Sequence, residues 1–241
     1  MSSFHLKLIA ITAMLCDHIG VALFPGDIAW RIIGRVAFPV FCFLIAEGAA
    51  HTKNIEKYLF RLMFFAIIAE GPFDLMGKGK LFDAGSQNVF FTLSLGLIGI
   101  CAVKYFAKRW YLWTVAVAAL AGVAQIIRSD YRWYGVLMIV GFYLARDLKL
   151  ARAGAFFIPT QLYALDRTFK LFRASPPPQG KLFLPYLFSD IQQNAVIGLV
   201  CILLYNGKRG YNRAWVKWGF YLFYPCHMLI LYFIKILVLC N

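Results

Sequence analysis

The chain has 241 residues, of which 61% are hydrophobic and 15% are charged. Soluble domains have about 45–50% apolar and about 25% charged residues, so this composition excludes a soluble globular protein and predicts an integral membrane protein. The formal net charge of +14 does not indicate nucleic-acid binding, because no basic patch lies on a soluble face. Lys and Arg fall instead between apolar runs, where cytoplasmic loops and membrane edges carry them.

Apolar runs recur along the whole chain, many of them near the length of about 20 residues that a helix needs to cross a membrane. The candidate spans are residues 6–24, 29–50, 58–76, 88–107, 110–127, 133–145, 153–165, 191–205 and 218–239. They predict an all-α, polytopic bundle of about nine transmembrane helices, in one domain over residues 1–241. Residues 166–190 contain a triple proline, which cannot continue a helix, and are expected to form a loop.

Basic residues are biased towards one set of loops. The loops after the second, fourth, sixth and eighth predicted spans hold more Lys and Arg than the other loops, and Lys7 precedes most of the first span. The positive-inside rule therefore predicts a cytoplasmic N-terminus. Basic residues at one membrane face are also suited to holding the phosphates of a soluble anion.

The six cysteines give no sign of a metal or disulfide site. Most of them fall in apolar runs, and no two form a CxxC pair. They match neither a disulfide framework nor a zinc site, so no metal ion is expected.

Polar side chains stand at similar depth in the first four predicted spans. Asp17 and His18 adjoin in the first span, and each of the next three spans carries two polar residues four positions apart, on one helix face. These pairs are Arg31 and Arg35, Glu70 and Asp74, and Asn88 and Thr92. Two interpretations stay open: a buried ion network that fixes helix packing, or a functional site.

Neighbouring residues on a helix point about 100° apart, so Asp17 and His18 face different directions. We expect Asp17 to meet an arginine of the second span, and His18 to face a cavity about 9 Å below the outer end of its helix. The arginine pair needs anions nearby, because neither guanidinium can lose its proton. The acids available are Asp17, Glu70 and Asp74.

A second intramembrane histidine, His227, follows Pro225 in the last predicted span. By its position in that span, it is expected nearer the middle of the membrane than His18. A proline inside a helix leaves one backbone carbonyl without its partner. His227 is therefore either a second functional group or a partner for that carbonyl.

Five stretches, in this order, make the sequence resemble the TraX family of bacterial membrane proteins. They are "LKLIAITAMLCDHIG", "RIIGRVAFPVFCFLIAEG", "RLMFFAIIAEGPFDL", "NVFFTLSLGL" and "FYPCHMLILYFIK". The namesake of the family acetylates F-pilin at its N-terminus, so the resemblance implies an acetyltransferase of the bacterial inner membrane. More distantly, the sequence resembles transmembrane acyltransferases of the acyltransferase-3 and heparan glucosaminide acetyltransferase type.

In that wider group, a membrane-embedded histidine serves acyl transfer from cytoplasmic acyl-CoA to an acceptor on the other side. The resemblance gives this role to His18, and Arg31 and Arg35 match basic residues of the pattern. It also implies acetyl-CoA as the co-substrate, whereas the acceptor stays open among a peptide, a pilin, a glycan and a small molecule.

The residue types suit this chemistry, because histidine can act near neutral pH as a base or as the nucleophile that carries the acyl group. An arginine, Asn88 or Thr92 is a candidate to stabilise the tetrahedral oxyanion. The candidate catalytic residues are His18, Asp17, Arg31, Arg35, Glu70, Asp74, Asn88 and Thr92. The candidate cofactor-binding residues are Lys53, Lys57, Arg61, Lys208, Arg209 and His227.

A proton-coupled membrane transporter is the alternative function, because buried Asp, Glu, Arg and His residues also form proton relays. Transporters more often show paired broken helices in two related halves. No such internal symmetry is visible in this sequence, which favours the acyltransferase.

Overall fold

A computed structural model describes residues 1–173 and 190–239, and these residues form helices and no strand. In chain order the elements are α1 (Ser3–Ala22), α2 (Ile28–Gly34), α3 (Ala37–His51), α4 (Ile55–Lys78), α5 (Val89–Tyr105), α6 (Trp110–Ile126), α7 (Arg132–Leu144), α8 (Lys149–Arg173), the 3-10 helix η1 (Ile191–Ala195), α10 (Val196–Leu203) and α11 (Ala214–Leu239). With α2–α3 and η1–α10 each taken as one segment, the described chain has 9 helical segments, as the sequence predicts.

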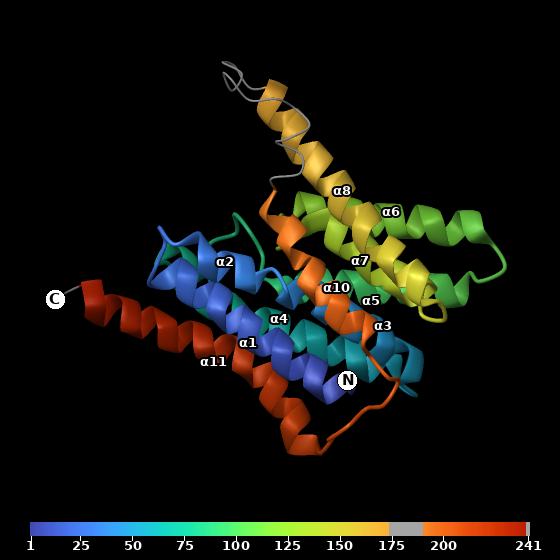
Figure 1. The fold of residues 1–241 in the computed structure, drawn as a ribbon, viewed down its shortest axis with the longest axis horizontal. Coiled ribbons are helices and arrows are strands. Elements are labelled where there is room, and N and C mark those ends of the chain that lie inside the picture. Colours follow the sequence, from blue (N-terminus) through green and yellow to red (C-terminus); the bar gives the residue numbers. More distant parts are fainter. Residues whose placement is uncertain (174–189, 240–241) are drawn as a thin grey trace.

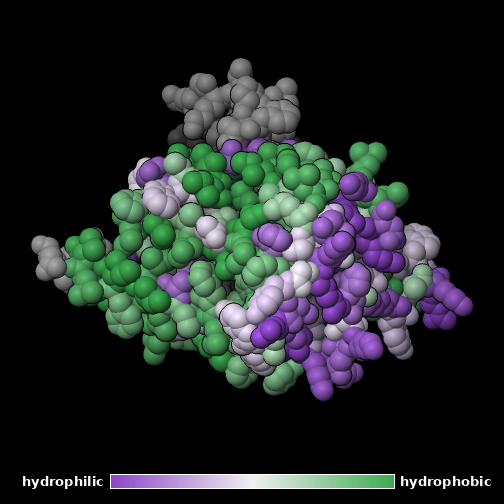
Figure 2. Space-filling model, turned by 60° about the horizontal axis from the view of Figure 1, so that its bottom comes forward, coloured by the Kyte–Doolittle hydropathy of each residue, from purple (hydrophilic) through white to green (hydrophobic). Residues whose placement is uncertain are grey.

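The helices form a bundle (Figure 1), and many large hydrophobic side chains are exposed on its outer surface. Three described segments are long and apolar enough to cross a membrane: Ser3–Ala22, Ile28–His51 and Ala214–Val238. Helices α5, α6 and α7 are shorter but also apolar. Figure 2 shows hydrophobic residues over most of one face of the molecule, with hydrophilic residues gathered on one side of it. The protein is a polytopic helical membrane protein.

Two predicted segments differ from the structure. The second span was expected to be one helix over residues 29–50, but α2 ends at Gly34, and α3 begins at Ala37. Around the break, the N–H of Arg35 lies 3.2 Å from the carbonyl oxygens of both Arg31 and Ile32, which is a tightened turn.

Helix α8 continues to Arg173 and so takes the first part of the predicted loop over residues 166–190. An ion pair of 2.6 Å between Lys170 and Asp166, one turn apart, supports this extension. The triple proline lies outside the described residues.

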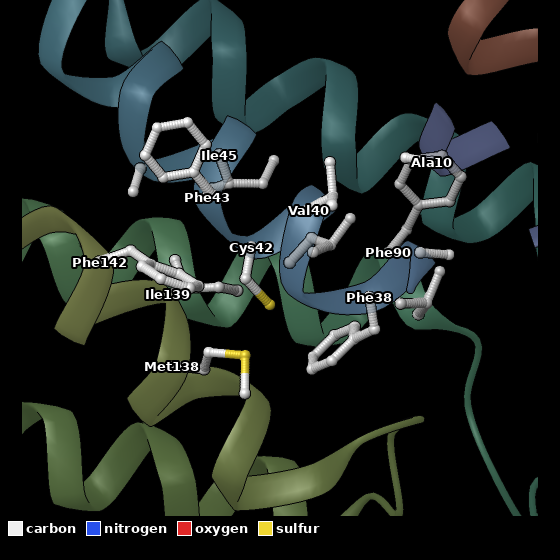
Figure 3. Packing of buried hydrophobic residues seen from close by; sticks show 14 of the residues in the cluster. Ala10, Phe38, Val40, Cys42, Phe43, Ile45, Phe90, Met138, Ile139 and Phe142 are labelled. Atoms are coloured by element: carbon white, nitrogen blue, oxygen red, sulfur yellow. The ribbon is translucent and has the colours of Figure 1, made fainter. Parts of the chain in front are cut away.

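Helix α3 lies at the centre of the bundle and packs against α1, α5, α7 and α10. In Figure 3, Cys42 and Phe43 of α3 face Met138, Ile139 and Phe142 of α7. The rings of Phe43 and Phe142 meet edge to face with 5.8 Å between their centroids. This packed centre supports α1, which in turn contacts α2, α3, α4 and α11.

The N-terminus and several basic loops meet at one end of the bundle, which we call the basic end. The backbone N–H of Ser3 donates to the carbonyl of Lys208 over 2.9 Å. The side chain of Arg209 donates to the carbonyl of His51 over 3.3 Å, and Lys104 donates to that of Ala49 over 2.6 Å. These contacts join the N-terminus to loops that follow the second, fourth and eighth predicted spans, which is the set that the charge bias selects.

At the other end, the α4–α5 and α6–α7 connections meet. The N–H of Asp130 donates to the carbonyl of Gln87 over 2.8 Å. Arg167 of α8 pairs with Asp190, which precedes η1, over 2.8 Å. In the described part of the chain, the basic loops and these connections therefore lie at opposite ends of the bundle.

Candidate active site

Two histidines from the first and last helices form a hydrogen-bonded pair. Nδ1 of His18 lies 2.6 Å from Nε2 of His227, and Nδ1 of His227 lies 2.6 Å from the carbonyl oxygen of Phe223. A carbonyl only accepts, so Nδ1 of His227 carries a proton, and Nε2 of its neutral ring is an acceptor. The network therefore assigns the donated proton to Nδ1 of His18 and leaves Nε2 of His18 with a free lone pair.

This pairing differs from the sequence prediction for His227. The prediction put His227 nearer the middle of the membrane and among the cofactor-binding candidates, whereas the structure places it against His18. The carbonyl that Pro225 leaves without a partner belongs to Tyr221, one turn earlier. His227 bonds the carbonyl of Phe223 instead, so it does not serve the carbonyl that the proline frees.

Asp17 turns away from the histidine pair and holds both arginines of the next segment. Its Oδ1 lies 3.0 Å from Nε of Arg31 and 2.6 Å from Nη2 of Arg35. The Arg35 side chain is 7% exposed and that of Arg31 is 40% exposed, so Arg35 is the buried partner and Arg31 is the accessible one. The predicted contact between the arginines and an acid is confirmed, and the acid is Asp17.

Glycines allow this close contact between α1 and α2. A Cβ atom on Gly34 would lie 2.3 Å from Cβ of Asp17, and one on Gly20 would lie 2.5 Å from Cβ of Trp30. Because both distances are shorter than any tolerable carbon contact, a larger residue at either position would push the two helices apart.

The other four catalytic candidates lie in separate polar clusters. Glu70 accepts a hydrogen bond from the side chain of Asn88, and Asn88 also donates to the carbonyl of Ala66 over 2.7 Å. Asp74 pairs with Lys78 over 3.1 Å.

The hydroxyl of Thr92 lies within hydrogen-bonding distance of two acceptors, Oγ of Ser129 at 2.9 Å and the carbonyl oxygen of Asp130. Among the described residues, the arginines contact neither Glu70 nor Asp74. The structure thus brings Asp17, Arg31 and Arg35 into direct contact, whereas the other four candidates have polar partners of their own.

A cavity of about 610 Å³ opens at the basic end and runs into the bundle between α1, α3, α4, α5 and α11. Its wall includes five cationic side chains: Lys7, Arg61, Arg209, Arg213 and Lys217. The only acidic side chain in this lining is Glu47, which accepts a hydrogen bond of 2.9 Å from the hydroxyl of Tyr205. The mouth of the cavity is therefore strongly positive.

Only part of the predicted cofactor-binding set lines this cavity. Arg61 and Arg209 do, whereas Lys53, Lys57, Lys208 and His227 do not. The prediction missed Arg213 and Lys217, although their place after the eighth span marked them as residues of the basic loops. No local motif identifies them as cavity residues, because only the fold brings α11 beside α4.

The closed end of the cavity reaches the histidine pair at Tyr224 of α11. Tyr224 lines the cavity and is 3% exposed. Its ring centroid lies 6.0 Å from that of His18, 5.8 Å from that of His227 and 5.2 Å from that of Phe90. Tyr224 is thus both part of the cavity wall and a ring neighbour of His18 and His227.

Comparisons with known proteins find one matching family and two relatives. A family model described as "TraX protein" matches residues 2–235. A relative named "Probable fimbrial assembly protein FimC, serogroup H1", from Dichelobacter nodosus, is 32% identical over 95% of this chain and 94% of its own length. An uncharacterized protein of Rickettsia prowazekii (strain Madrid E) is 29% identical over 53% of this chain and 57% of its own length. No solved structure matches.

Proposed function

Because this chain belongs to the TraX family, we propose that it is a membrane-embedded acyltransferase that moves an acetyl group from acetyl-CoA to an amine or hydroxyl acceptor. The observation that carries the proposal is the hydrogen-bonded pair of His18 and His227 beside the closed end of a cavity with a cationic mouth. The pair supplies a base, and the cavity supplies a route for an anionic donor.

The cavity suits coenzyme A in both charge and shape. Coenzyme A carries several phosphate charges at one end and a narrow, uncharged arm at the other. Arg and Lys bind phosphate through charge-assisted hydrogen bonds, so the five cations at the mouth favour the phosphates. The deeper wall contains apolar side chains such as Leu62, Leu93 and Phe90, which suit the arm and its thioester.

His18 acts as the general base and then as the general acid. Its Nε2 takes the proton from the acceptor N–H or O–H, while the acceptor atom bonds to the thioester carbonyl carbon. When the tetrahedral intermediate collapses, the carbon–sulfur bond breaks, and the thiolate takes that proton from His18. The acetyl group is then on the acceptor, free coenzyme A leaves, and His18 is neutral again.

His227 positions this base. Nε2 of His227 accepts a hydrogen bond from Nδ1–H of His18. This bond fixes the tautomer of His18 in which Nε2 carries no proton. The same hydrogen bond persists when His18 becomes doubly protonated, so it also stabilises the cation that forms during the reaction.

We assign stabilisation of the oxyanion to Arg31, the accessible member of the arginine pair. It contacts Asp17 through Nε, and its side chain is 40% exposed, which leaves the rest of its guanidinium for another anion. Asn88 and Thr92, the other oxyanion candidates, donate to Glu70 and to the carbonyl of Asp130 instead. Pre-oriented donors of this kind are worth about 10²–10³ in kcat.

In this proposal the basic end faces the cytoplasm of a bacterial inner membrane, and acceptor and donor arrive from opposite sides. The positive-inside rule supports this orientation, because the N-terminus meets basic loops at that end. The name of the Dichelobacter nodosus relative, a probable fimbrial assembly protein, favours a pilin-type acceptor over a glycan or a small molecule.

Turnover of acetyl-CoA by purified protein in lipid nanodiscs tests the proposal. We expect release of coenzyme A and acetylation of a peptide with a pilin N-terminus, both lost in His18→Ala. The control His5→Ala should keep activity, because His5 lies exposed at the start of α1, where its ring bonds to Ser2. If the wild-type protein neither transfers nor hydrolyses acetyl, or if His18→Ala turns over normally, the proposal is wrong. Proton uptake by proteoliposomes without acetyl transfer would favour the transporter.

The cationic mouth has its own test. A hydrogen bond to a charged group contributes about 1.5–3 kcal/mol, so Arg61→Gln or Arg209→Gln should weaken acetyl-CoA binding by about tenfold or more. Lys53→Gln removes an equal charge from the same end of the bundle but does not line the cavity, so its affinity should stay near that of the wild type. Equal losses in all three variants would contradict a binding site in this cavity.

A further inference from the structure

We propose that Tyr224 sets the length of the acyl group that the protein accepts. This inference rests on the proposed acyl transfer and assigns a specificity-determining residue to it. Tyr224 belongs to the wall of the cavity and also contacts both members of the histidine pair. No other cavity residue among those described has ring contacts with both histidines.

The surroundings of Tyr224 leave little spare room. Its ring packs edge-on against Phe90 with 5.2 Å between centroids, and Phe90 in turn stacks on Tyr221 at 6.3 Å. Phe90 is 6% exposed and Leu93 is 4% exposed, so the closed end of the cavity is a wall of buried apolar side chains. A closely packed wall resists added volume, because overpacking forces side chains off their preferred rotamers.

The direction of entry makes this wall the acyl boundary. The phosphates of the donor are held at the mouth, so the sulfur and then the acyl group arrive last, at the end where Tyr224 stands. For reaction, the thioester carbonyl must come within about 3–3.5 Å of the attacking atom beside His18. The acyl chain beyond the carbonyl must then share the space that the Tyr224 ring occupies.

An acetyl group adds one methyl beyond the carbonyl, and every further methylene must displace the ring or its neighbours. Pockets discriminate a single methylene by about 10–200-fold. Wild-type protein should therefore prefer acetyl strongly over butyryl and hexanoyl donors. Shortening the side chain at position 224 should relax this limit and leave the phosphate contacts at the mouth unchanged.

The test compares acetyl-, butyryl- and hexanoyl-CoA as donors for the wild type, Tyr224→Leu and Tyr224→Ala. We expect the ratio of kcat/KM for hexanoyl over acetyl to rise at least tenfold in Tyr224→Ala and less in Tyr224→Leu. Phe220→Leu is the matched control, because Phe220 also lines the cavity but lies beside Lys7, away from the histidines. Its chain-length profile should equal that of the wild type.

Folding and the basic reaction are checked on the same samples. Gel filtration and coenzyme A affinity show whether each variant is folded, and Tyr224→Leu decides the question if Tyr224→Ala does not fold. An unchanged chain-length ratio in a folded, active Tyr224→Leu variant overturns the inference and leaves the acyltransferase proposal standing. Absence of wild-type turnover with all three donors overturns both. A Phe220→Leu shift as large as that of Tyr224→Leu would show that no single residue sets the limit.

Discussion

Replacing Gly34 by alanine tests whether close approach of α1 and α2 builds the ion pair. An added Cβ would lie 2.3 Å from Cβ of Asp17 and 2.4 Å from its Oδ1. Cβ of Asp17 is fixed to the α1 backbone, so it cannot move aside as the end of a flexible side chain could. The two helices must therefore separate, and the contact of 2.6 Å between Asp17 and Arg35 must lengthen or break.

Two terms set the magnitude. Overpacking of a closely fitted site costs about 1–3 kcal/mol. Separating a buried ion pair adds to this cost, and complete removal of one partner lowers the free energy of unfolding by about 3–5 kcal/mol. Since the pair here is stretched and Arg31 stays near, we expect Gly34→Ala to lower the free energy of unfolding by about 2–4 kcal/mol.

The control is Gly122→Ala on α6, where an added Cβ meets nothing within 4 Å. Alanine inside a helix is favoured over glycine by about 0.5–1 kcal/mol, so this variant should be slightly more stable than the wild type. Reversible unfolding in lipid bicelles measures both variants under the same conditions. Equal stabilities for Gly34→Ala and Gly122→Ala would refute the steric argument and the proposed geometry of α1 and α2.

Two further predictions follow from the ion pair and from the charge bias. Asp17→Asn should destabilise the fold by about 3–5 kcal/mol, because it removes the carboxylate that pairs directly with Arg35, which is 7% exposed. Arg31→Gln should cost only about 0–1 kcal/mol, since Arg31 is 40% exposed. The same unfolding assay ranks them, and a reversed order would contradict the assignment of the buried partner. For topology, single cysteines in a cysteine-free background should react with an impermeant reagent in intact cells at position 80 but not at 108 or 208. Labelling at either basic position would reverse the orientation.

The transmembrane helices and the contact between the arginines and an acid could be predicted from the sequence, for a physical reason. Hydrophobic length and charge cost act locally, so the apolar runs mark the spans, and two buried arginines four residues apart require an acid. Of the three candidate acids, Asp17, Glu70 and Asp74, Asp17 lies nearest to the arginines in the chain. The break coincides with Gly34, and Pro39 lies in the first turn of α3, but single glycines and prolines also occur inside transmembrane helices and therefore did not mark a helix end.

The histidine pair could not be derived in the same way. His18 and His227 are separated by 209 positions, and local patterns do not say which helix lies beside α11. The depth of a residue in the membrane also does not determine how its helix is rotated about its axis, and so does not say which neighbour its side chain faces. Glu70 and Asp74 share the predicted depth of the arginines, yet they face the connection between α4 and α5. Tyr224 was missed because one aromatic residue in an aromatic-rich chain carries no distinguishing signal.

Asp17 and His18, which are neighbours in the sequence, together fix the rotation of α1 about its axis. A step of about 100° around α1 lets one face of the helix bind α2 and the next face bind α11. Asp17 ties α1 to the arginines, and His18 ties it to His227. A rotation of α1 that improved one contact would break the other, so the two hydrogen-bonded sides fix its rotation. In the proposed reaction a general base must be held in this way, because an error of about 1 Å in its position can cost about 10²-fold in rate. In that proposal, Asp17 serves the reaction by holding the helix in place rather than by touching the substrate.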